Sequence, residues 1–293
     1  MRILIAATPE VAIPSIKALK QSEHTIVIAT QPAKPAGRGL KMLPTPVSME
    51  FPEAIQIHNE KDLQDLLGGI DLLITIGYGR ILSMETLIIP KFGGINLHFS
   101  LLPKWRGAAP VQRAIEAGDF ETGVTVFQMD AGMDAGPIWT QDMISIDHET
   151  NAPKLFNQLS LMGADNLISA ITLIESGMSP TPQMGNSSIA AKINKDEALI
   201  DWSASAEINL RKIKALAFNP VCRGQFRSQI VKILDAERSN SSLEVGQIND
   251  AGEVGCGVGA IKLLTVLPAG KKAMSAKDWI NGLKLQAGEK FEW

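Results

Sequence analysis

Cysteine is scarce in this chain of 293 residues, which contains two, Cys222 and Cys256. The two lie far apart, form no CxxC pair and have no cluster of histidines beside them. Such isolated cysteines are typical of reduced thiols and not of a metal site. We therefore expect a cytoplasmic protein that binds no metal.

Long apolar runs are also missing. No apolar stretch approaches the roughly 20 residues that a membrane-spanning helix needs, and the first residues, MRILIAATPE, enter a strand pattern at once. We expect neither a membrane span nor a signal or transit peptide. The composition, with 45% apolar and 20% charged residues, is that of an ordinary globular protein.

The first half of the chain alternates short apolar runs with helical ones. The runs that we interpret as strands cover residues 2–7, 25–29, 54–57, 71–76, 94–98, 123–129 and 138–146. Short apolar strands separated by helices predict a doubly wound, mostly parallel α/β sheet. The first strand-to-helix turn, Ala7-Thr8-Pro9-Glu10, lacks GxGxxG, which argues against an NAD-type dehydrogenase.

The second half follows a different pattern. A helix over residues 152–176, with Asn151 as its N-cap, precedes a stretch rich in Pro, Ser and Asn that we interpret as a linker. After Trp202, a helix over 206–216 and strand candidates at 229–236, 246–248, 254–258 and 260–266 predict a small OB-like β-barrel. We expect an α/β domain over 1–181, a linker over 182–203 and the barrel domain over 204–293.

Charge is distributed unevenly around a net value of −3. From Trp202 onward the chain has 13 lysines and arginines against 9 aspartates and glutamates, a net charge of +4. Residues 1–201 have 15 against 22, a net charge of −7. A basic appendage of this kind is compatible with a polyanionic partner, although a solvated surface gives the same count.

Two polar side chains share one face of the predicted strand at residues 94–98. Asn96 and His98 are two residues apart, so on an extended strand they project together. The carboxyl end of a strand in an open parallel sheet is where ligands bind. A turn hydrogen bond for Asn96 and a core position for His98 are the alternative interpretations.

A pair of aspartates, Asp130 and Asp134, lies in the glycine-broken segment QMDAGMDAGPI between two apolar runs. Glycines on both sides permit unusual backbone angles. The alternative is an ordinary tight turn that an aspartate stabilises locally. Sequence alone does not bring this segment to His98.

These motifs carry a resemblance to a family. The pattern NxHxSLLPxxRGxxP followed by GxDxGPI resembles the 10-formyltetrahydrofolate-dependent formyltransferases, and the resemblance covers most of the chain. PAKPAGRGLKMLPTPV is similar to the family's inserted loop, IDWSASA to its domain junction and LLTVLPAGKKAMSAKDW to its C-terminal barrel. The resemblance implies that Asn96, His98 and Asp134 form a catalytic triad.

The implied chemistry is direct formyl transfer to an amine, without a covalent enzyme intermediate. Asn96 can donate an N–H to the developing oxyanion, while His98 supplies a second donor or moves a proton. Asp134 would orient and charge His98 and accept the proton of the amine. By the same resemblance, the residues expected to hold 10-formyltetrahydrofolate are Arg80, Ile81, Leu82, Ser100, Leu101, Leu102 and Pro103.

Members of the family act on different acceptors, and the triad does not distinguish them. The inserted loop, which contains the sequence AGRG at residues 36–39, and the basic C-terminal half favour initiator methionyl-tRNA as the acceptor. We therefore expect a role in translation initiation. We also expect the protein to be monomeric. The residues expected to contact the nucleic acid are Lys34, Arg38, Lys41, Lys192, Lys195, Arg211, Lys271 and Lys272. The alternatives are a sugar-nucleotide N-formyltransferase and a noncatalytic tRNA-binding module, the latter disfavoured by the intact triad.

Two positions depart from the family pattern. Val221-Cys222 stand where the family usually has Trp-Pro, and Phe99 replaces a small residue between the motif's histidine and serine. The first puts the local barrel packing in doubt. The second is expected to crowd the loop beside His98.

Overall fold

The computed structural model describes residues 1–36 and 41–292, which divide into two compact units. The N-terminal unit comprises Met1–Pro110, Glu121–Ser145 and Phe156–Ala190. The C-terminal unit comprises Val111–Phe120, Ile146–Leu155 and the chain from Ala191 on. Each unit is thus built from three separate segments of the sequence. The expected organisation instead divided the chain into three continuous segments, with boundaries at 181 and 203. Those boundaries stay predictions.

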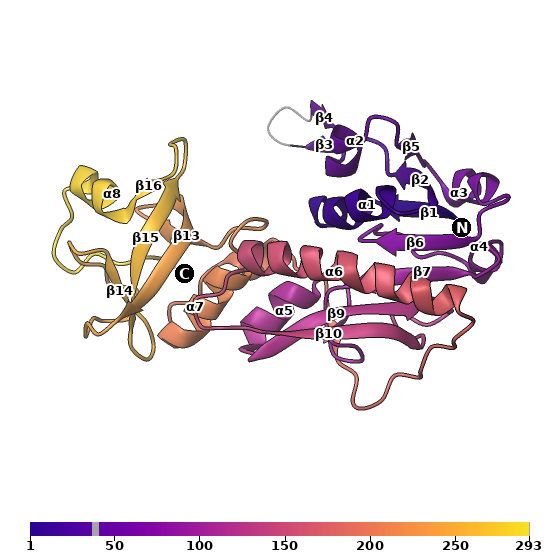
Figure 1. The fold of residues 1–293 in the computed structure, drawn as a ribbon. Coiled ribbons are helices and arrows are strands. Elements are labelled where there is room, and N and C mark those ends of the chain that lie inside the picture. The colour runs from indigo at the N-terminus through magenta and orange to yellow at the C-terminus, as the bar shows by residue number, and fades with distance from the viewer. Residues whose placement is uncertain (37–40, 293) are drawn as a thin grey trace. The chain divides into compact units, whose positions relative to one another are not determined.

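A seven-stranded sheet organises the N-terminal unit (Figure 1), in the order β10-β9-β7-β6-β1-β2-β5. Its strands are β1 (Arg2–Ala7), β2 (Thr25–Thr30), β5 (Ile55–Gln56), β6 (Leu72–Ile76), β7 (Gly94–His98), β9 (Glu121–Gln128) and β10 (Ile138–Ser145). Five of them run parallel, as the buried apolar runs predicted. The last two, β9 and β10, instead form an antiparallel hairpin against β7.

Short helices and strand pairs surround this sheet. They are η1 (Glu10–Ala12), α1 (Ile13–Lys20), β3 (Lys34–Ala36), β4 (Lys41–Leu43), α2 (Pro46–Glu50), α3 (Glu60–Leu66), α4 (Met84–Leu87), β8 (Arg106–Gly107) and β11 (Ile189–Ala190). The strands β8 and β11 pair in parallel. Part of the predicted linker therefore folds back onto the segment that follows β7.

The long helix α6 (Ala152–Glu175) matches the predicted helix to within one residue. Asn151 caps it by accepting the backbone N–H of Lys154 at 3.0 Å. Gly177, with φ of 73°, ends it in the left-handed conformation that favours glycine. Both signals were visible in the sequence.

Alternation along β7 directs successive side chains to opposite faces of the sheet. Leu97 faces α6 so closely that a Cβ on Gly163 would lie 2.6 Å from a Leu97 methyl group. Asn96 and His98 alternate with Leu97 and therefore point to the opposite face. That face is the one on which Leu73 of β6 packs with Leu63 of α3 in a buried apolar cluster.

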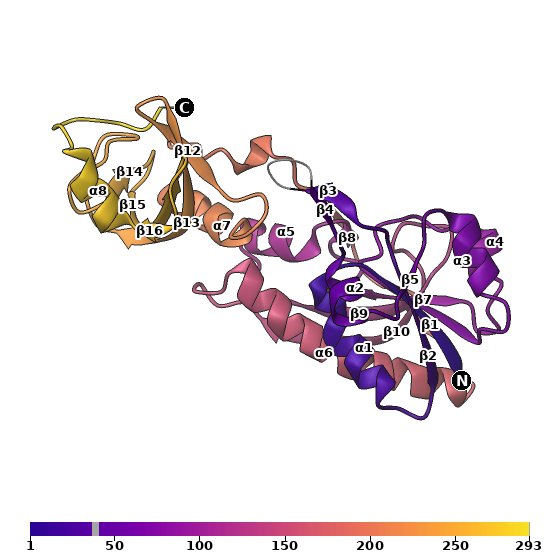
Figure 2. The ribbon, with the colours of Figure 1, turned by 90° about the horizontal axis from the view of Figure 1, so that it is seen from above.

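The C-terminal unit has an antiparallel sheet in the order β12-β13-β15-β14, with β16 paired to β15 (Figure 2). Its elements are α5 (Pro110–Ala117), η2 (Asp196–Ala198), α7 (Ala206–Ala215), β12 (Arg223–Phe226), β13 (Gln229–Ser239), β14 (Glu253–Gly255), β15 (Ala260–Pro268), β16 (Met274–Ser275) and α8 (Ala276–Leu283). The strand predicted at 246–248 was wrong, because these residues make isolated bridges. The elements β12, β16 and α8 had not been predicted.

Aromatic rings fill the core of this second unit. The ring of Phe291 lies 4.8 Å from that of Trp202 and 5.3 Å from that of Phe226, measured between centroids. Both cysteines of the chain are buried and free. Cys222 donates its thiol to the carbonyl of Lys212, and burial raises the pKa of this thiol to about 12. The departure at Val221-Cys222 is thus accommodated by burial of the thiol.

Candidate active site

A cavity of about 540 Å³ opens where β6 and β7 end. Its lining comes from four stretches of the N-terminal unit: the loop after β6, the end of β7, the segment 107–110 and the loop that joins β9 to β10. The carboxyl ends of parallel strands meet here, at the edge of an open sheet where ligands bind. Asn96, His98 and Asp134 all line this cavity.

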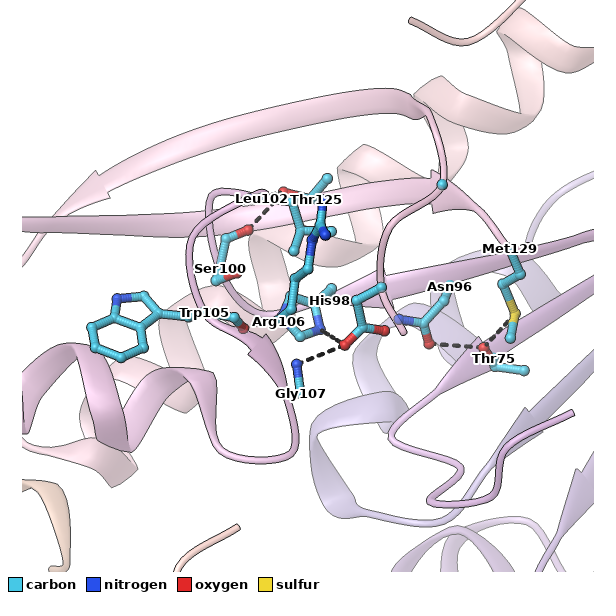
Figure 3. Close-up of polar contacts among 12 residues, drawn as sticks. Thr75, Asn96, His98, Ser100, Leu102, Trp105, Arg106, Gly107, Thr125 and Met129 are labelled. Carbon is cyan, nitrogen blue, oxygen red and sulfur yellow. Dashed lines mark hydrogen bonds and ion pairs between the residues drawn. The ribbon is translucent and has the colours of Figure 1, made fainter. Parts of the chain in front are cut away.

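Asn96 is oriented by the neighbouring strand. The hydroxyl of Thr75 in β6 donates to Asn96 Oδ1 at 2.7 Å and lies 3.3 Å from the sulfur of Met129 (Figure 3). Because Oδ1 is engaged by this donor, the two N–H groups of the amide are directed away from Thr75. Asn96 therefore presents donors to the cavity.

His98 is fixed by a backbone carbonyl. Its Nε2 lies 2.8 Å from the carbonyl oxygen of Trp105, a group that only accepts, so Nε2 carries a proton. The residue is 6% exposed. Burial lowers the pKa of the imidazole below its usual value, and the carboxylate of Asp134 partly opposes this shift. At neutral pH the imidazole is thus uncharged, with a bare Nδ1.

Asp134 approaches that nitrogen from the β9–β10 loop. Its Oδ2 lies 3.8 Å from His98 Nδ1 and accepts the backbone N–H of Gly107 at 2.8 Å. Asp134 has a φ of 50°, an unfavourable backbone angle for a residue with a Cβ. Aspartate tolerates this left-handed conformation better than most residues with a Cβ, although negative φ remains more favourable.

The backbone angle at position 107 and the nearby carbonyl of Ala190 both require a glycine there. Its φ is 115°, and a Cβ there would lie 2.8 Å from the carbonyl oxygen of Ala190. A side chain at this position would separate β8 from β11 and move the N–H that binds Asp134. The glycine of the RG motif thus supports the acidic member of the trio.

The residues expected to hold folate divide into two groups. Of the described residues, those that line the cavity include Arg80, Ile81 and Leu82 but not the set Ser100, Leu101, Leu102 and Pro103. Ser100 is fully buried, and its carbonyl accepts the Thr125 hydroxyl at 2.6 Å. The N–H of Leu102 donates to the same hydroxyl at 3.2 Å. The segment 100–103 is therefore hydrogen-bonded to Thr125 of β9. Its contact with folate stays a prediction.

Phe99 follows His98 directly and also lines the cavity. It is 7% exposed, and its ring stands edge to face with Phe156 of α6, at 6.2 Å between centroids. Most of the Phe99 ring therefore packs against α6. Only a small part of the ring faces the cavity.

The residues expected to contact nucleic acid lie in both units. The ammonium group of Lys34 donates an N–H to Gln31 Oε1, and Arg211 forms an ion pair with Glu207. Arg38 lies outside the described residues, and the side chain of Lys41 is likewise not described. The exposed members among the described side chains are Lys34, Lys192, Lys195, Lys271 and Lys272.

A second cavity, of about 480 Å³, lies in the C-terminal unit and is lined partly by Arg211 and Lys214. Glu149 and Glu207, which pair with these cations, line it as well. Such neutralised charges leave little free attraction for an anion. Across residues 1–36 and 41–292, no helix is long and apolar enough to cross a membrane.

Three residues that support the trio were missed by sequence reasoning. Thr75 lies in a buried strand among apolar residues, and Gly107 belongs to a motif in which only the triad was given a role. Gln183 lies in the predicted linker and donates to the backbone carbonyls of Asp134 and Gly136, each at 2.9 Å. A lone hydroxyl within a buried strand is the one signal that could have identified Thr75.

Comparison with known proteins gives two family matches. Residues 1–171 match the formyl transferase family, and residues 192–284 match the formyl transferase C-terminal domain. Among curated relatives, the methionyl-tRNA formyltransferase of Hydrogenovibrio crunogenus is 38% identical, with 97% of each chain covered. That of Jannaschia sp. is 36% identical, with 100% of each chain covered.

Solved structures share the fold at lower identity. HypX from Aquifex aeolicus in complex with tetrahydrofolic acid has a TM-score of 0.70 at 18% identity, covering 96% of this chain. This chain spans 47% of the HypX chain. An N-formyltransferase from Helicobacter canadensis, in complex with folinic acid and dTDP-3-aminofucose, has a TM-score of 0.66 at 19% identity, covering 90% of this chain and 99% of that one. The chain belongs to the formyl transferase family, and its full-length relatives place it among the methionyl-tRNA formyltransferases.

Proposed function

We propose that the chain transfers the formyl group of 10-formyltetrahydrofolate to the amino group of initiator methionyl-tRNA, for translation initiation. The observation that carries the proposal is the convergence of Asn96, His98 and Asp134 on one cavity, in a chain that matches methionyl-tRNA formyltransferases along its whole length. The reaction needs a free amine, a polarised formyl carbonyl and an acceptor for one proton. The three side chains meet the last two needs.

Asn96 is the group that stabilises the developing negative charge. As the amine attacks the formyl carbon, the formyl oxygen gains charge, and a preorganised N–H donor lowers the energy of that state. Thr75 occupies Asn96 Oδ1, so the amide is held with its donors available before the substrates bind. No reorientation of the side chain is then needed during the reaction.

His98 and Asp134 together remove the proton of the amine. The bare Nδ1 of the neutral imidazole is the basic atom that faces Asp134. Once protonated, the ring is a cation 3.8 Å from a carboxylate, which stabilises the charge. The proton therefore leaves the amine without a covalent bond to the enzyme, and His98 could then give it to the folate nitrogen as the bond between that nitrogen and the formyl carbon breaks.

The cavity suits a folate in size and lining. Its volume of about 540 Å³ lies within the range of small-molecule sites. Arg80 and Ile81, on the loop after β6, and the buried Leu82 line the cavity, which supports the proposal that they hold the folate. The bound folate supplies the activated formyl group, and the chain supplies orientation and proton transfer.

The remaining parts of the proposal concern the acceptor. Charged tRNA is used in the cytoplasm, which is where we place the enzyme, as a monomer that requires no metal. Exposed lysines such as Lys271 and Lys272 of the C-terminal unit supply cations for phosphate groups. The main alternative acceptor is the amino group of a sugar nucleotide.

Parallel assays with one formyl donor separate these acceptors. The purified chain is incubated with 10-formyltetrahydrofolate and, in separate reactions, charged initiator tRNA, glycinamide ribonucleotide and an amino-sugar nucleotide. We expect formyl transfer to methionyl-tRNA. Transfer to a sugar alone would refute the proposed acceptor, and transfer to none would refute the proposed chemistry.

Salt dependence tests the inserted loop. If Arg38 contacts tRNA phosphates, Arg38→Ala weakens the use of methionyl-tRNA and flattens its dependence on salt concentration. Lys91→Ala, which removes an exposed cation of the N-terminal unit outside the predicted set, is the matched control. Unchanged tRNA kinetics in Arg38→Ala would remove this loop from the proposal.

A further inference from the structure

Gln183 lies outside the described lining of the cavity, yet it holds the loop that carries Asp134. Its side-chain nitrogen donates one N–H to the carbonyl of Asp134 and the other to the carbonyl of Gly136, both at 2.9 Å. The residue comes from the segment between α6 and β11, far from this loop in sequence. Both donors of the amide are therefore used on the two sides of one turn.

Arg106 fixes the opposite end of the same amide. Its Nε and Nη2 lie 3.2 and 2.6 Å from Gln183 Oε1. Because a guanidinium only donates and the two carbonyls only accept, the amide has one orientation that satisfies all its partners. Gln183 is thus a bridge with a defined direction, from the guanidinium to the loop.

The bridge acts on the same residue as the RG motif. Gly107, next to Arg106 in β8, donates its N–H to the carboxylate of Asp134. Arg106 reaches the backbone of that residue through Gln183. The carboxylate and the main chain of Asp134 are therefore held by two successive residues of β8, one directly and one through the bridge.

Such support matters because the loop is strained where the carboxylate is placed. Asp134 has a φ of 50°, and a loop released from its anchors relaxes toward negative φ. That change would turn the side chain away from His98. The separation of 3.8 Å between Asp134 Oδ2 and His98 Nδ1 depends on this backbone conformation.

We propose that Gln183 is a positioning residue for formyl transfer, which keeps the Asp134 carboxylate beside His98 by holding the carbonyls of Asp134 and Gly136. The proposal rests on the proposed function of the site. The competing explanation is that Gln183 only fastens its own segment to the N-terminal unit. The two differ in what is lost: the competing role affects stability, whereas positioning affects kcat.

Two substitutions of Gln183 distinguish the role of its amide oxygen from that of its amide nitrogen. Gln183→Leu removes every polar contact. Gln183→Glu keeps an oxygen for Arg106 and adds an ion pair, but replaces the two donors by a second acceptor, which repels the carbonyls. If positioning is the role, kcat in Gln183→Glu falls by more than the change in its melting temperature accounts for.

Gln128 provides a matched control in the same unit. Its amide nitrogen also donates to two backbone carbonyls, those of Phe92 and Gly94, and its Oε1 accepts the indole N–H of Trp139. Gln128→Leu therefore loses a comparable set of hydrogen bonds at the other end of β7. We expect it to lower the melting temperature about as much as Gln183→Leu, with kcat within about twofold of wild type.

The kinetic test measures formylation of methionyl-tRNA by wild type and the three variants, with melting temperatures. We expect kcat to fall about 10- to 100-fold in both Gln183 variants, with KM for each substrate within about twofold. Wild-type kcat in the Gln183 variants would overturn the inference. So would a loss of activity that follows melting temperature across all three variants.

An NMR titration of His98 tests the inference without any substrate. The charged side chain that acts on this imidazole is Asp134, which raises its pKa against the lowering effect of burial. Displacing Asp134 in Gln183→Leu therefore lowers the pKa of His98 further, and Gln128→Leu leaves it unchanged. An unchanged pKa in Gln183→Leu contradicts the inference. A wild-type chain that does not formylate methionyl-tRNA contradicts the proposed function instead.

Discussion

Replacing Asp134 by asparagine removes one negative charge and keeps the shape of the side chain. The amide oxygen of Asp134→Asn can still accept the N–H of Gly107, which bonds Oδ2 at 2.8 Å. The same oxygen then lies near His98 Nδ1, but it no longer carries a negative charge. The variant thus changes the electrostatics of the pair while the supporting hydrogen bond persists.

The size of the effect follows from the distance. Two opposite unit charges 3.8 Å apart interact by about 4 kcal/mol at an effective dielectric constant of about 20. This energy stabilises the protonated imidazole and is absent in Asp134→Asn. Since about 1.4 kcal/mol corresponds to a factor of ten, we expect kcat to fall by about 10³-fold, within the range for positioned acid and base groups.

The assay combines kinetics with a titration. Single-turnover formylation of methionyl-tRNA gives the rate of the chemical step, and NMR gives the pKa of His98. In the wild type, burial holds this pKa below its usual value while Asp134 raises it, so the variant has a still lower pKa. A near-wild-type rate, or a pKa of His98 that rises in the variant, would refute the role given to Asp134.

Three further predictions concern the supports of the site and the second unit. Thr75→Val removes the hydroxyl that orients Asn96, so kcat falls about 10-fold while KM is retained in steady-state kinetics. Gly107→Ala forces a Cβ to 2.8 Å from the Ala190 carbonyl at a φ of 115°, which lowers the unfolding free energy in urea by about 1–3 kcal/mol. Hydrogen bonds from Ser241, Asn249 and Ser239 lower the pKa of Glu253 from 4.5 to about 2. The stability lost in Glu253→Gln is therefore full above pH 4.5 and vanishes as the pH falls toward 2, as urea unfolding across that range would reveal.

The elements that the sequence predicted best are those with an unbroken local signal. The apolar run of β1 is buried from Ile3 to Ala7, and β7 has the bounds predicted for it. The helix α6 was bounded by Asn151 and Gly177, residues whose chemistry favours helix ends. In each case the information lies within a few residues of the element itself.

Whether a strand runs parallel or antiparallel to its neighbour could not be predicted from such local signals. Buried strands such as β9 have the same apolar composition whether they run parallel or antiparallel, so their composition left the direction of β9 against β7 open. The loop that joins β9 to β10, residues 129–137, is too short to hold the helix of a parallel crossover. That length and the glycines of the loop are compatible with a β9–β10 hairpin, which had not been predicted.

The pairing of Asn96 with His98 was predicted because it depends only on the two-residue period of a strand. The approach of Asp134 to His98 depends on the hairpin, and residues 36 positions apart share no local pattern. Gln183 is further still from the residues it supports, and the polar segment around it predicted a linker. Long-range hydrogen bonds to backbone carbonyls leave no trace in a single sequence.

The residues that hold the trio all belong to the N-terminal unit. Thr75 orients Asn96, Trp105 fixes His98, and Gly107 together with Gln183 holds Asp134. None of these interactions involves a described residue of the C-terminal unit, so substitutions confined to that unit remove none of these hydrogen bonds. Under the proposed function, the choice of acceptor can therefore change through the C-terminal unit while Asn96, His98 and Asp134 keep their hydrogen bonds.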